Sequence, residues 1–114
     1  MRFSTEKSQQ IWNTVSRVPY GKVSSYGFIA DLAGLPGRAR MVGSVLQYAP
    51  PEMQLPWHRI LKSNGQIAFA AGSASAQRQK ELLQEEGVVV LNNRVDMKRY
   101  SWQPDLIEMM QMDY

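Results

Sequence analysis

The sequence contains no cysteine, which excludes a disulfide, a zinc–thiolate site and a cysteine nucleophile. It contains a single histidine, His58, so we expect no metal site built from protein ligands and no bound cofactor. No apolar run approaches the length of a membrane span. Residues 1–7 also lack the apolar core of a signal peptide. We therefore expect a cytoplasmic protein with no membrane partner.

The composition is that of one small globular domain. A chain of 114 residues with 44% hydrophobic residues can bury a single modest core. The net charge of +3 is compatible with nucleic-acid binding where the charge is clustered. We expect a mainly α domain with small β elements over residues 1–104, followed by a tail over residues 105–114. The tail is rich in methionine and acidic residues, and it is compatible with either a short helix or a frayed end.

Helical spacing marks the first half of the chain. A helix is predicted from a cap at Ser4 or Thr5 to about Val18, ended by Pro19 and Gly21. Two further helices are predicted around a short turn at residues 35–37. The first opens at residue 24 or 25 and ends at residue 34, and the second covers residues 38–48. Such a pair forms a helix-turn-helix, although helical corners also occur in proteins that never bind DNA.

The second half mixes strand and helix signals. Asn64 and Gly65 between apolar residues predict the turn of a small hairpin or wing. Ser75 is the predicted cap of a helix over residues 76–86. An extended run over residues 88–91 and a strand over residues 94–102 are predicted to pair around a turn at residues 92–93.

One short stretch, residues 56–60 with the sequence PWHRI, places an indole, an imidazole and a guanidinium side by side. The loop before it, residues 49–56, is rich in proline, which fixes the backbone and is expected to exclude helix there. Two interpretations remain open from these residues alone. The stretch either forms a wall of a binding site or is a packed Trp57 with solvated neighbours.

The PWHRI stretch resembles the PCHRV motif of the 6-O-alkylguanine-DNA alkyltransferases, with tryptophan in place of the acceptor cysteine. Three further segments resemble the same family, namely VPYGKVSSYG at residues 18–27, AGLPGRARMVG at residues 33–43 and KELLQEEG at residues 80–87. The resemblance covers roughly residues 6–87 and is to the alkyltransferase-like proteins, which lack the reactive thiol. It implies a winged helix-turn-helix-like fold similar to the alkyltransferase C-terminal domain.

The resemblance implies DNA-binding roles for residues of the two central helices. Arg40 matches an arginine that enters the base stack from the minor groove, although an arginine there is otherwise a solvated surface residue. Tyr26 matches a tyrosine that helps to rotate a nucleotide out of the duplex, and its alternative role is a half-buried core residue. Arg38 is expected to contact phosphate. Gly43 and Ser44 are small. By resemblance they let this helix press into the minor groove, and the alternative is that they allow close packing against another helix.

A second set of residues is implied to form and support an alkylguanine pocket. Trp57 cannot act as a nucleophile, but its flat apolar face can contact an alkylated base. Pro56 and His58 are expected beside it. His58 and Glu86 match residues that activate the enzymes' thiol, and here we expect them to hold the loop and the closing helix together. Arg59 is expected to form an internal pair.

Two departures from the family pattern concern the pocket. Ala49 stands where the enzymes usually carry asparagine, and residues 68–73 replace a tyrosine–serine pair that contacts the base. A hydroxyl is missing near Ala71 unless Ser73 reaches the base. We therefore expect a wider pocket that tolerates bulky alkyl groups.

Three functions are compatible with these observations. The leading one is a non-enzymatic sensor that binds double-stranded DNA, flips 6-O-alkylguanine and, by resemblance, flags it for nucleotide excision repair proteins. The second is an enzyme, either an alkyl-transfer protein or a glycosylase using His58 or Glu86. The third is a helix-turn-helix transcription regulator, which is usually a dimer. No additional dimerisation element is evident in the sequence, so we expect a monomer.

Overall fold

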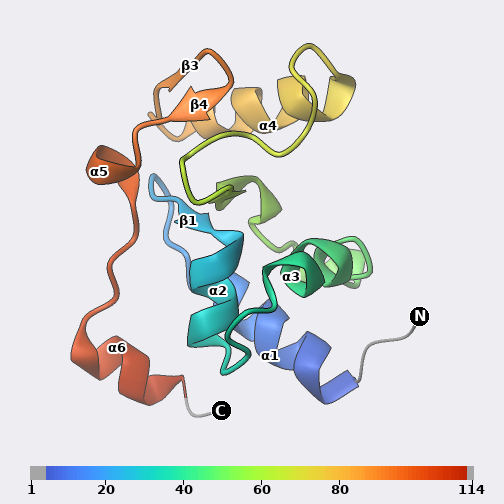
Figure 1. The fold of residues 1–114 in the computed structure, drawn as a ribbon, viewed down its shortest axis with the longest axis vertical. Helices are drawn as coiled ribbons and strands as arrows, with labels where there is room; N and C mark the ends of the chain where they lie inside the picture. The colour runs from blue at the N-terminus through green and yellow to red at the C-terminus, as the bar shows by residue number, and fades with distance from the viewer. Residues whose placement is uncertain (1–4, 113–114) are drawn as a thin grey trace.

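A computed structural model describes residues 5–112 of the chain and confirms the predicted class, mainly α with small β elements. Figure 1 shows the order of the elements along the chain. The α-helices are α1 (Thr5–Val15), α2 (Tyr26–Leu32), α3 (Ala39–Leu46), α4 (Ala74–Glu85), α5 (Met97–Tyr100) and α6 (Leu106–Gln111). Two 3₁₀ helices, η1 (Pro51–Met53) and η2 (Trp57–Arg59), lie between α3 and α4. The strands are β1 (Ser24–Ser25), β2 (Ile60–Leu61), β3 (Val90–Leu91) and β4 (Arg94–Val95).

Helix α1 is shorter than predicted. It ends at Val15 rather than near Val18, and the following backbone forms tight turns. The Ser16 hydroxyl donates to the carbonyl of Asn13, which is the kind of local bond that competes with helix continuation. The cap proposed at Ser4 lies outside the described residues. Near the end of the helix, the indole nitrogen of Trp12 donates to the Val45 carbonyl over 2.8 Å and ties α1 to α3.

Helices α2 and α3 form the predicted helix-turn-helix. Ser25 is the cap of α2, because its hydroxyl accepts a hydrogen bond from the backbone nitrogen of Phe28. Ser24, the alternative cap, lies in β1. Gly34, with φ of +78°, takes the left-handed conformation after the last turn of α2, as predicted. Arg38 is the cap position of α3, which is two residues shorter at its C-terminal end than the predicted span.

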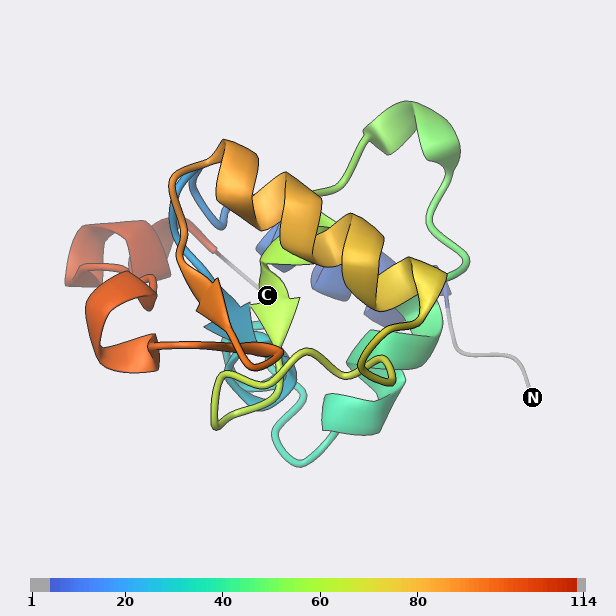
Figure 2. The ribbon, with the colours of Figure 1, turned by 90° about the horizontal axis from the view of Figure 1, so that it is seen from above.

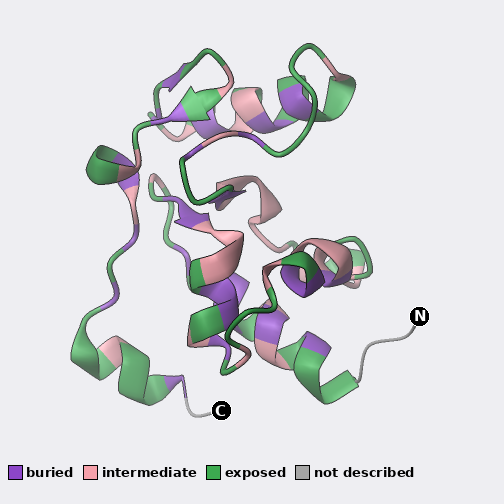
Figure 3. Cartoon of the chain, in the orientation of Figure 1, coloured by how far each residue is buried: buried purple, intermediate pink, exposed green. Residues whose placement is uncertain are grey.

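Two groups of buried residues form the core, and β2 joins them. The first, which we call the α1–α3 cluster, contains the buried faces of α1, α2 and α3 together with Ile60. The second, the α4 cluster, contains Leu61 and the buried residues of α4, β3 and β4. Because neighbouring strand residues point to opposite faces, Ile60 and Leu61 fill different clusters. Strand β2 pairs in parallel with β1, in the middle of the molecule (Figures 1 and 3).

The turn at Asn64 and Gly65 forms, but the predicted hairpin around it does not. The Lys62 backbone nitrogen donates to the Gln66 carbonyl across the turn. Beyond that bond the two arms pair with other segments: β2 pairs with β1, and Gln66 bridges to Arg94. Long-range pairing therefore replaces the local hairpin.

Three further expectations for the second half are corrected. Helix α4 is capped by Ser73 rather than Ser75, since the Ser73 hydroxyl accepts from the Ala76 backbone nitrogen. Strand β4 pairs antiparallel with β3 but stops at Val95, because Asp96 caps α5 where a strand was predicted as far as residue 102. The proline-rich loop contains η1, where helix was expected to be excluded. Pro51 occupies its first turn, a position that proline tolerates.

The segment after residue 104 contains α6, the helical alternative for the tail. Asp105 and Glu108 form a reciprocal capping box at its start. Met112 is only 6% exposed and belongs to the α1–α3 cluster. The domain boundary at residue 104 stays a prediction. Seen from above, α4 crosses over the centre of the molecule (Figure 2). No helix among residues 5–112 is long and apolar enough to span a membrane.

Candidate nucleic-acid interface

A cavity of about 790 Å³ opens between the helix-turn-helix, η2 and the loop that leads into α4. Five residues predicted from the sequence lie in its wall, namely Tyr26, Arg40, Gly43, Ser44 and Trp57. The remaining wall residues are Ala39, Leu46, Gln47, Lys62, Ala68, Phe69 and Ser75. The cavity therefore brings together residues that are up to 49 positions apart, from Tyr26 to Ser75.

Helix α3 turns one face to the core and the other to the cavity. Its buried residues are Met41, Val42 and Val45. Residues 40, 43, 44 and 47 line the cavity, which is the spacing of one helical face. Arg40 is exposed, and no ion pair holds it within residues 5–112. Its guanidinium is therefore available to a partner at the mouth of the cavity.

Tyr26 stands opposite α3 at the first turn of α2. Burial raises the pKa of its phenol, so the hydroxyl stays protonated at neutral pH and can donate a hydrogen bond. A Cβ placed on Gly43 would lie 3.8 Å from the Tyr26 ring, which is ordinary contact. No backbone atom approaches that position within 4 Å, so close backbone packing does not explain the glycine. Its missing side chain instead leaves space in the cavity wall.

Trp57 is held between two aromatic edges. The His58 ring lies 6.1 Å from the indole at an interplanar angle of 84°, and the Phe69 ring lies 6.3 Å away at 82°. Edge-to-face pairs at these separations are favourable. Phe69 and Trp57 both line the cavity, and His58 does not. The indole is thus fixed from the protein side by the imidazole and from within the cavity by the phenyl ring.

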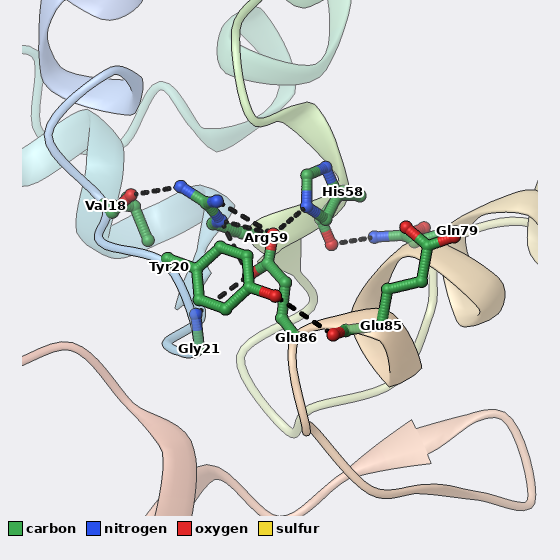
Figure 4. A network of polar contacts seen from close by, with 8 residues as sticks. All are labelled: Val18, Tyr20, Gly21, His58, Arg59, Gln79, Glu85 and Glu86. Atoms are coloured by element: carbon green, nitrogen blue, oxygen red, sulfur yellow. Dashed lines mark hydrogen bonds and ion pairs between the residues drawn. The ribbon is translucent and has the colours of Figure 1, made fainter.

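Glu86, at the end of α4, is the centre of a polar network (Figure 4), none of whose residues lines the cavity. Its carboxylate lies 2.7 Å from Nε2 of His58 and accepts hydrogen bonds from Nε and Nη2 of Arg59 at 2.8–3.1 Å. It also accepts one from the backbone nitrogen of Gly21 at 2.8 Å. Arg59 donates further to the Val18 carbonyl. The network joins the segment after α1, the η2 helix and the end of α4.

The surroundings of Glu86 favour its ionised form. Burial raises the pKa of the carboxyl group, but hydrogen bonds from Arg59, Gly21 and His58 outweigh burial and hold the pKa at about 2. The Glu86 side chain is only 6% exposed, so its charge depends on Arg59 for compensation. The Arg59 guanidinium also lies 5.6 Å from the centre of the Tyr20 ring.

Gln79 is a second support that the sequence analysis did not identify. Its buried side-chain amide donates to the carbonyls of His58 and Ile60, at 2.9 and 3.0 Å. These bonds fix the backbone of η2 and the start of β2 from the side of α4. A signal was present: Gln79 shares the buried face of α4 with Ala76 and Leu83. A polar residue on an apolar face usually has a specific hydrogen-bond partner.

Several predicted site residues lie outside the cavity wall. Arg38 is exposed at the start of α3, and Pro56 precedes η2. Ala71 is exposed in the loop before α4, and the Ser73 hydroxyl is engaged in capping that helix. Among the wall residues, Gln47 could have been found from the helical spacing after Arg40. Within residues 5–112, no group of three or more metal-ligating side chains comes together.

Comparisons with known proteins agree with this geometry. The family model described as 6-O-methylguanine DNA methyltransferase, DNA binding domain, matches residues 6–88. Alkyltransferase-like protein 1 of Schizosaccharomyces pombe is 40% identical over 100 residues, covering 83% of this chain and 93% of that protein. The DNA base-flipping protein of Escherichia coli is 41% identical over 95 residues, covering 82% of this chain and 72% of that protein.

A solved structure extends the similarity to three dimensions. The crystal structure of S. pombe Atl1 in complex with damaged DNA containing O6-carboxymethylguanine matches with a TM-score of 0.80 and 39% sequence identity. The match covers 91% of this chain and 100% of the Atl1 chain. The chain therefore belongs to the family defined by the DNA-binding domain of the 6-O-methylguanine DNA methyltransferases, and it resembles the alkyltransferase-like members.

Proposed function

We propose that this protein is a DNA-damage sensor that binds duplex DNA, flips a 6-O-alkylguanine and holds it in the cavity without transferring the alkyl group. One observation carries the proposal. A cavity beside the helix-turn-helix is walled by Arg40, Tyr26 and Trp57, and by resemblance to the PCHRV motif Trp57 stands where the enzymes carry the acceptor cysteine. The similar S. pombe structure contains damaged DNA, which supports a lesion as the ligand.

The residues around the cavity suit extrusion of a base. The 6-position of guanine faces its pairing partner inside the duplex, so it becomes accessible only after unstacking, at a cost of a few kcal/mol. Arg40 has no ion-pair partner within residues 5–112. It projects from the same face of α3 as Gly43 and Ser44, which are both small. A planar cation can fill the vacated stack and donate to the unpaired base. Tyr26, kept neutral, can donate to the backbone phosphate.

The same residues argue against catalysis. An indole has no accessible anion at neutral pH, and the sequence has no thiol to replace it. The Glu86 carboxylate is hydrogen-bonded to both His58 and Arg59, and none of the three side chains lines the cavity. They serve in this proposal as the support of η2. Arg38, exposed at the start of α3, provides a phosphate contact.

A sensor without chemistry needs a partner that removes the lesion. We propose that this partner belongs to the nucleotide excision repair machinery and that the protein binds DNA as a monomer. The absence of a tyrosine–serine pair from residues 68–73 supports tolerance of bulky alkyl groups. Adducts bulkier than methyl are expected to bind at least as tightly as the methylated base, and a strict preference for methyl would contradict this part of the proposal.

The test is equilibrium binding to two duplexes that differ only by one 6-O-methylguanine, at one stated salt concentration, followed by mass spectrometry. Tighter binding to the lesion with unchanged protein and DNA masses is expected. Equal binding to both duplexes would remove the lesion hypothesis and leave a helix-turn-helix regulator. A released base would identify a glycosylase, and a protein mass increase would identify alkyl transfer.

The Arg40→Ala variant separates the inserted arginine from general charge. It should lose most of the preference for the lesion duplex. Arg78→Ala is the matched control, since Arg78 is exposed on α4 and absent from the cavity wall. Both variants remove one positive charge, so an equal loss in both would show that Arg40 contributes only electrostatic attraction.

A further inference from the structure

We propose that Phe69 is a specificity-determining residue, which with Trp57 forms an aromatic corner that binds an aromatic 6-O-substituent more tightly than a methyl group. The inference rests on the proposed function and adds the preferred class of adduct. It assigns this preference to a residue outside the segments that resemble the family motifs. The support comes from the geometry of the corner, the anchoring of the loop and the character of the remaining wall.

The corner is open toward the cavity. Phe69 meets Trp57 edge to face at 82°, so the two rings form adjacent, nearly perpendicular walls. Phe69 remains 38% exposed although it is a large apolar residue, and it lines the cavity. A planar group placed in such a corner can stack on one ring while its edge meets the other. A methyl group offers much less contact area to either ring than a planar aromatic group does.

The loop that carries Phe69 is held in place before any ligand binds. The Asn93 side-chain amide donates to the Phe69 carbonyl at 3.3 Å. The Asn93 carbonyl in turn accepts from the backbone nitrogen of Ile67 at 2.9 Å, and the Ile67 side chain is 1% exposed in the α4 cluster. The β3–β4 turn therefore fixes the loop on both sides of Ala68. A preorganised ring loses less freedom when a ligand packs against it.

The rest of the wall does not offer an equal site for an aromatic group. Only Arg40 and Lys62 among the wall residues carry charge, and both are exposed. None of the described wall residues carries a carboxylate, so no negative charge in the wall repels an electron-rich ring. Lys62 could attract an anionic adduct, but an exposed cation is strongly hydrated and contributes little. The aromatic corner is thus the feature of the wall that distinguishes adducts by their shape.

The test measures binding to three duplexes that carry guanine, 6-O-methylguanine or 6-O-benzylguanine at the same position. The unaltered protein should bind the benzyl duplex more tightly than the methyl duplex. Phe69→Ala and Phe69→Leu should weaken benzyl binding about 3- to 10-fold, the range for an aromatic pair. Because Phe69 also packs against Trp57, both should weaken methyl binding as well, but by a smaller factor than benzyl binding. Phe69→Tyr keeps the ring and should keep the preference.

Matched controls make the outcomes separable. Phe28→Ala removes a phenyl ring that is 36% exposed, against 38% for Phe69, and that does not line the cavity. This variant should not change binding to either lesion duplex. If Phe69→Ala retains the benzyl preference, or weakens all three duplexes equally, the inference is overturned. The same holds if the unaltered protein binds both lesions with equal affinity. If it binds all three duplexes equally, the proposed function itself fails, which is a different result.

Asn93→Gly tests the anchoring of the loop. Asn93 has φ of +61°, so glycine keeps the backbone conformation while removing the amide that holds the Phe69 carbonyl. Benzyl binding should fall by a larger factor than methyl binding. A uniform loss, or none, would show that Asn93 does not position the ring.

Discussion

Replacing Glu86 by glutamine should strongly destabilise the fold at neutral pH. The carboxylate makes five hydrogen-bond or ion-pair contacts with Gly21, His58 and Arg59, and glutamine cannot supply the negative charge. Lowering the pKa from 4.5 to about 2 corresponds to about 3 kcal/mol, at roughly 1.4 kcal/mol for each tenfold change in acidity. Leaving Arg59 without its counter-charge costs a similar amount, about 3–5 kcal/mol in comparable buried pairs. A domain of this size has a total stability of about 5–15 kcal/mol.

The effect of this substitution depends on pH in a defined direction. The folded protein holds the pKa of Glu86 below its unfolded value, so its contribution is complete above about pH 5. The contribution is lost as the pH falls through 4.5 toward 2, because the unfolded chain then binds the proton more strongly. The difference between the unaltered protein and Glu86→Gln should thus be about 3 kcal/mol at pH 7 and about half of that at pH 3.

Urea denaturation followed by tryptophan fluorescence measures both values. Glu85→Gln is the control, since Glu85 is exposed and its only contact in the network is a backbone carbonyl that accepts from the Tyr20 hydroxyl. Glu85→Gln should change the free energy of unfolding by less than about 0.5 kcal/mol. Equal effects of the two variants at pH 7, or a difference that grows toward pH 3, would refute the assigned role of Glu86.

Three further predictions concern charge, a buried amide and a tight turn. Lys62→Ala should weaken binding to lesion and unmodified duplexes by the same factor and reduce the slope of log K against log salt by about 0.9, as measured in a salt titration. Gln79→Leu should lower the free energy of unfolding by about 1–3 kcal/mol for the buried Ile60 carbonyl left without this donor, and by less for the partly buried His58 carbonyl, as measured by denaturation. Gly65→Ala should unfold at much lower urea concentration, because its Cβ would overlap the Val95 carbonyl. Gly72→Ala, with a similar φ of +83° and open space around it, should cost only about 1–2 kcal/mol.

Local signals in the sequence predicted the three α-helices of the first half, α1, α2 and α3, but not strand β1. The cap at Ser25 and the left-handed Gly34 act on their own neighbours, so the sequence specifies them directly. Errors came where two local solutions compete. Ser73 and Ser75 are both acceptable caps, and it is the Ser73 hydroxyl that accepts from the Ala76 backbone nitrogen. The strand signal of residues 94–102 gave way to the cap at Asp96, whose side chain bonds to the Lys98 backbone.

The candidate site was predictable where it lies on α3 and not where it depends on loops. The helical spacing after Arg40 places residues on one face of a helix whatever the rest of the chain does. Phe69 lies in a loop without periodicity, and its position depends on Asn93 in a different turn. The partner of Glu86 could be proposed only from the family resemblance. Contacts across 27 positions, such as that with Arg59, have no local signature.

The route of the chain after β4 has a consequence for how the protein is made. Tyr100 belongs to the α4 cluster, whereas Trp102 and Met112 return to the α1–α3 cluster, where the Arg17 side chain contacts the Gln111 carbonyl 94 positions away. The first three helices therefore emerge from the ribosome with part of their apolar surface uncovered. They stay so until α6 has been synthesised, because only then can Met112 cover it. During translation the apolar surface of these helices therefore waits for a residue that follows the end of α3 by 66 positions, from Leu46 to Met112.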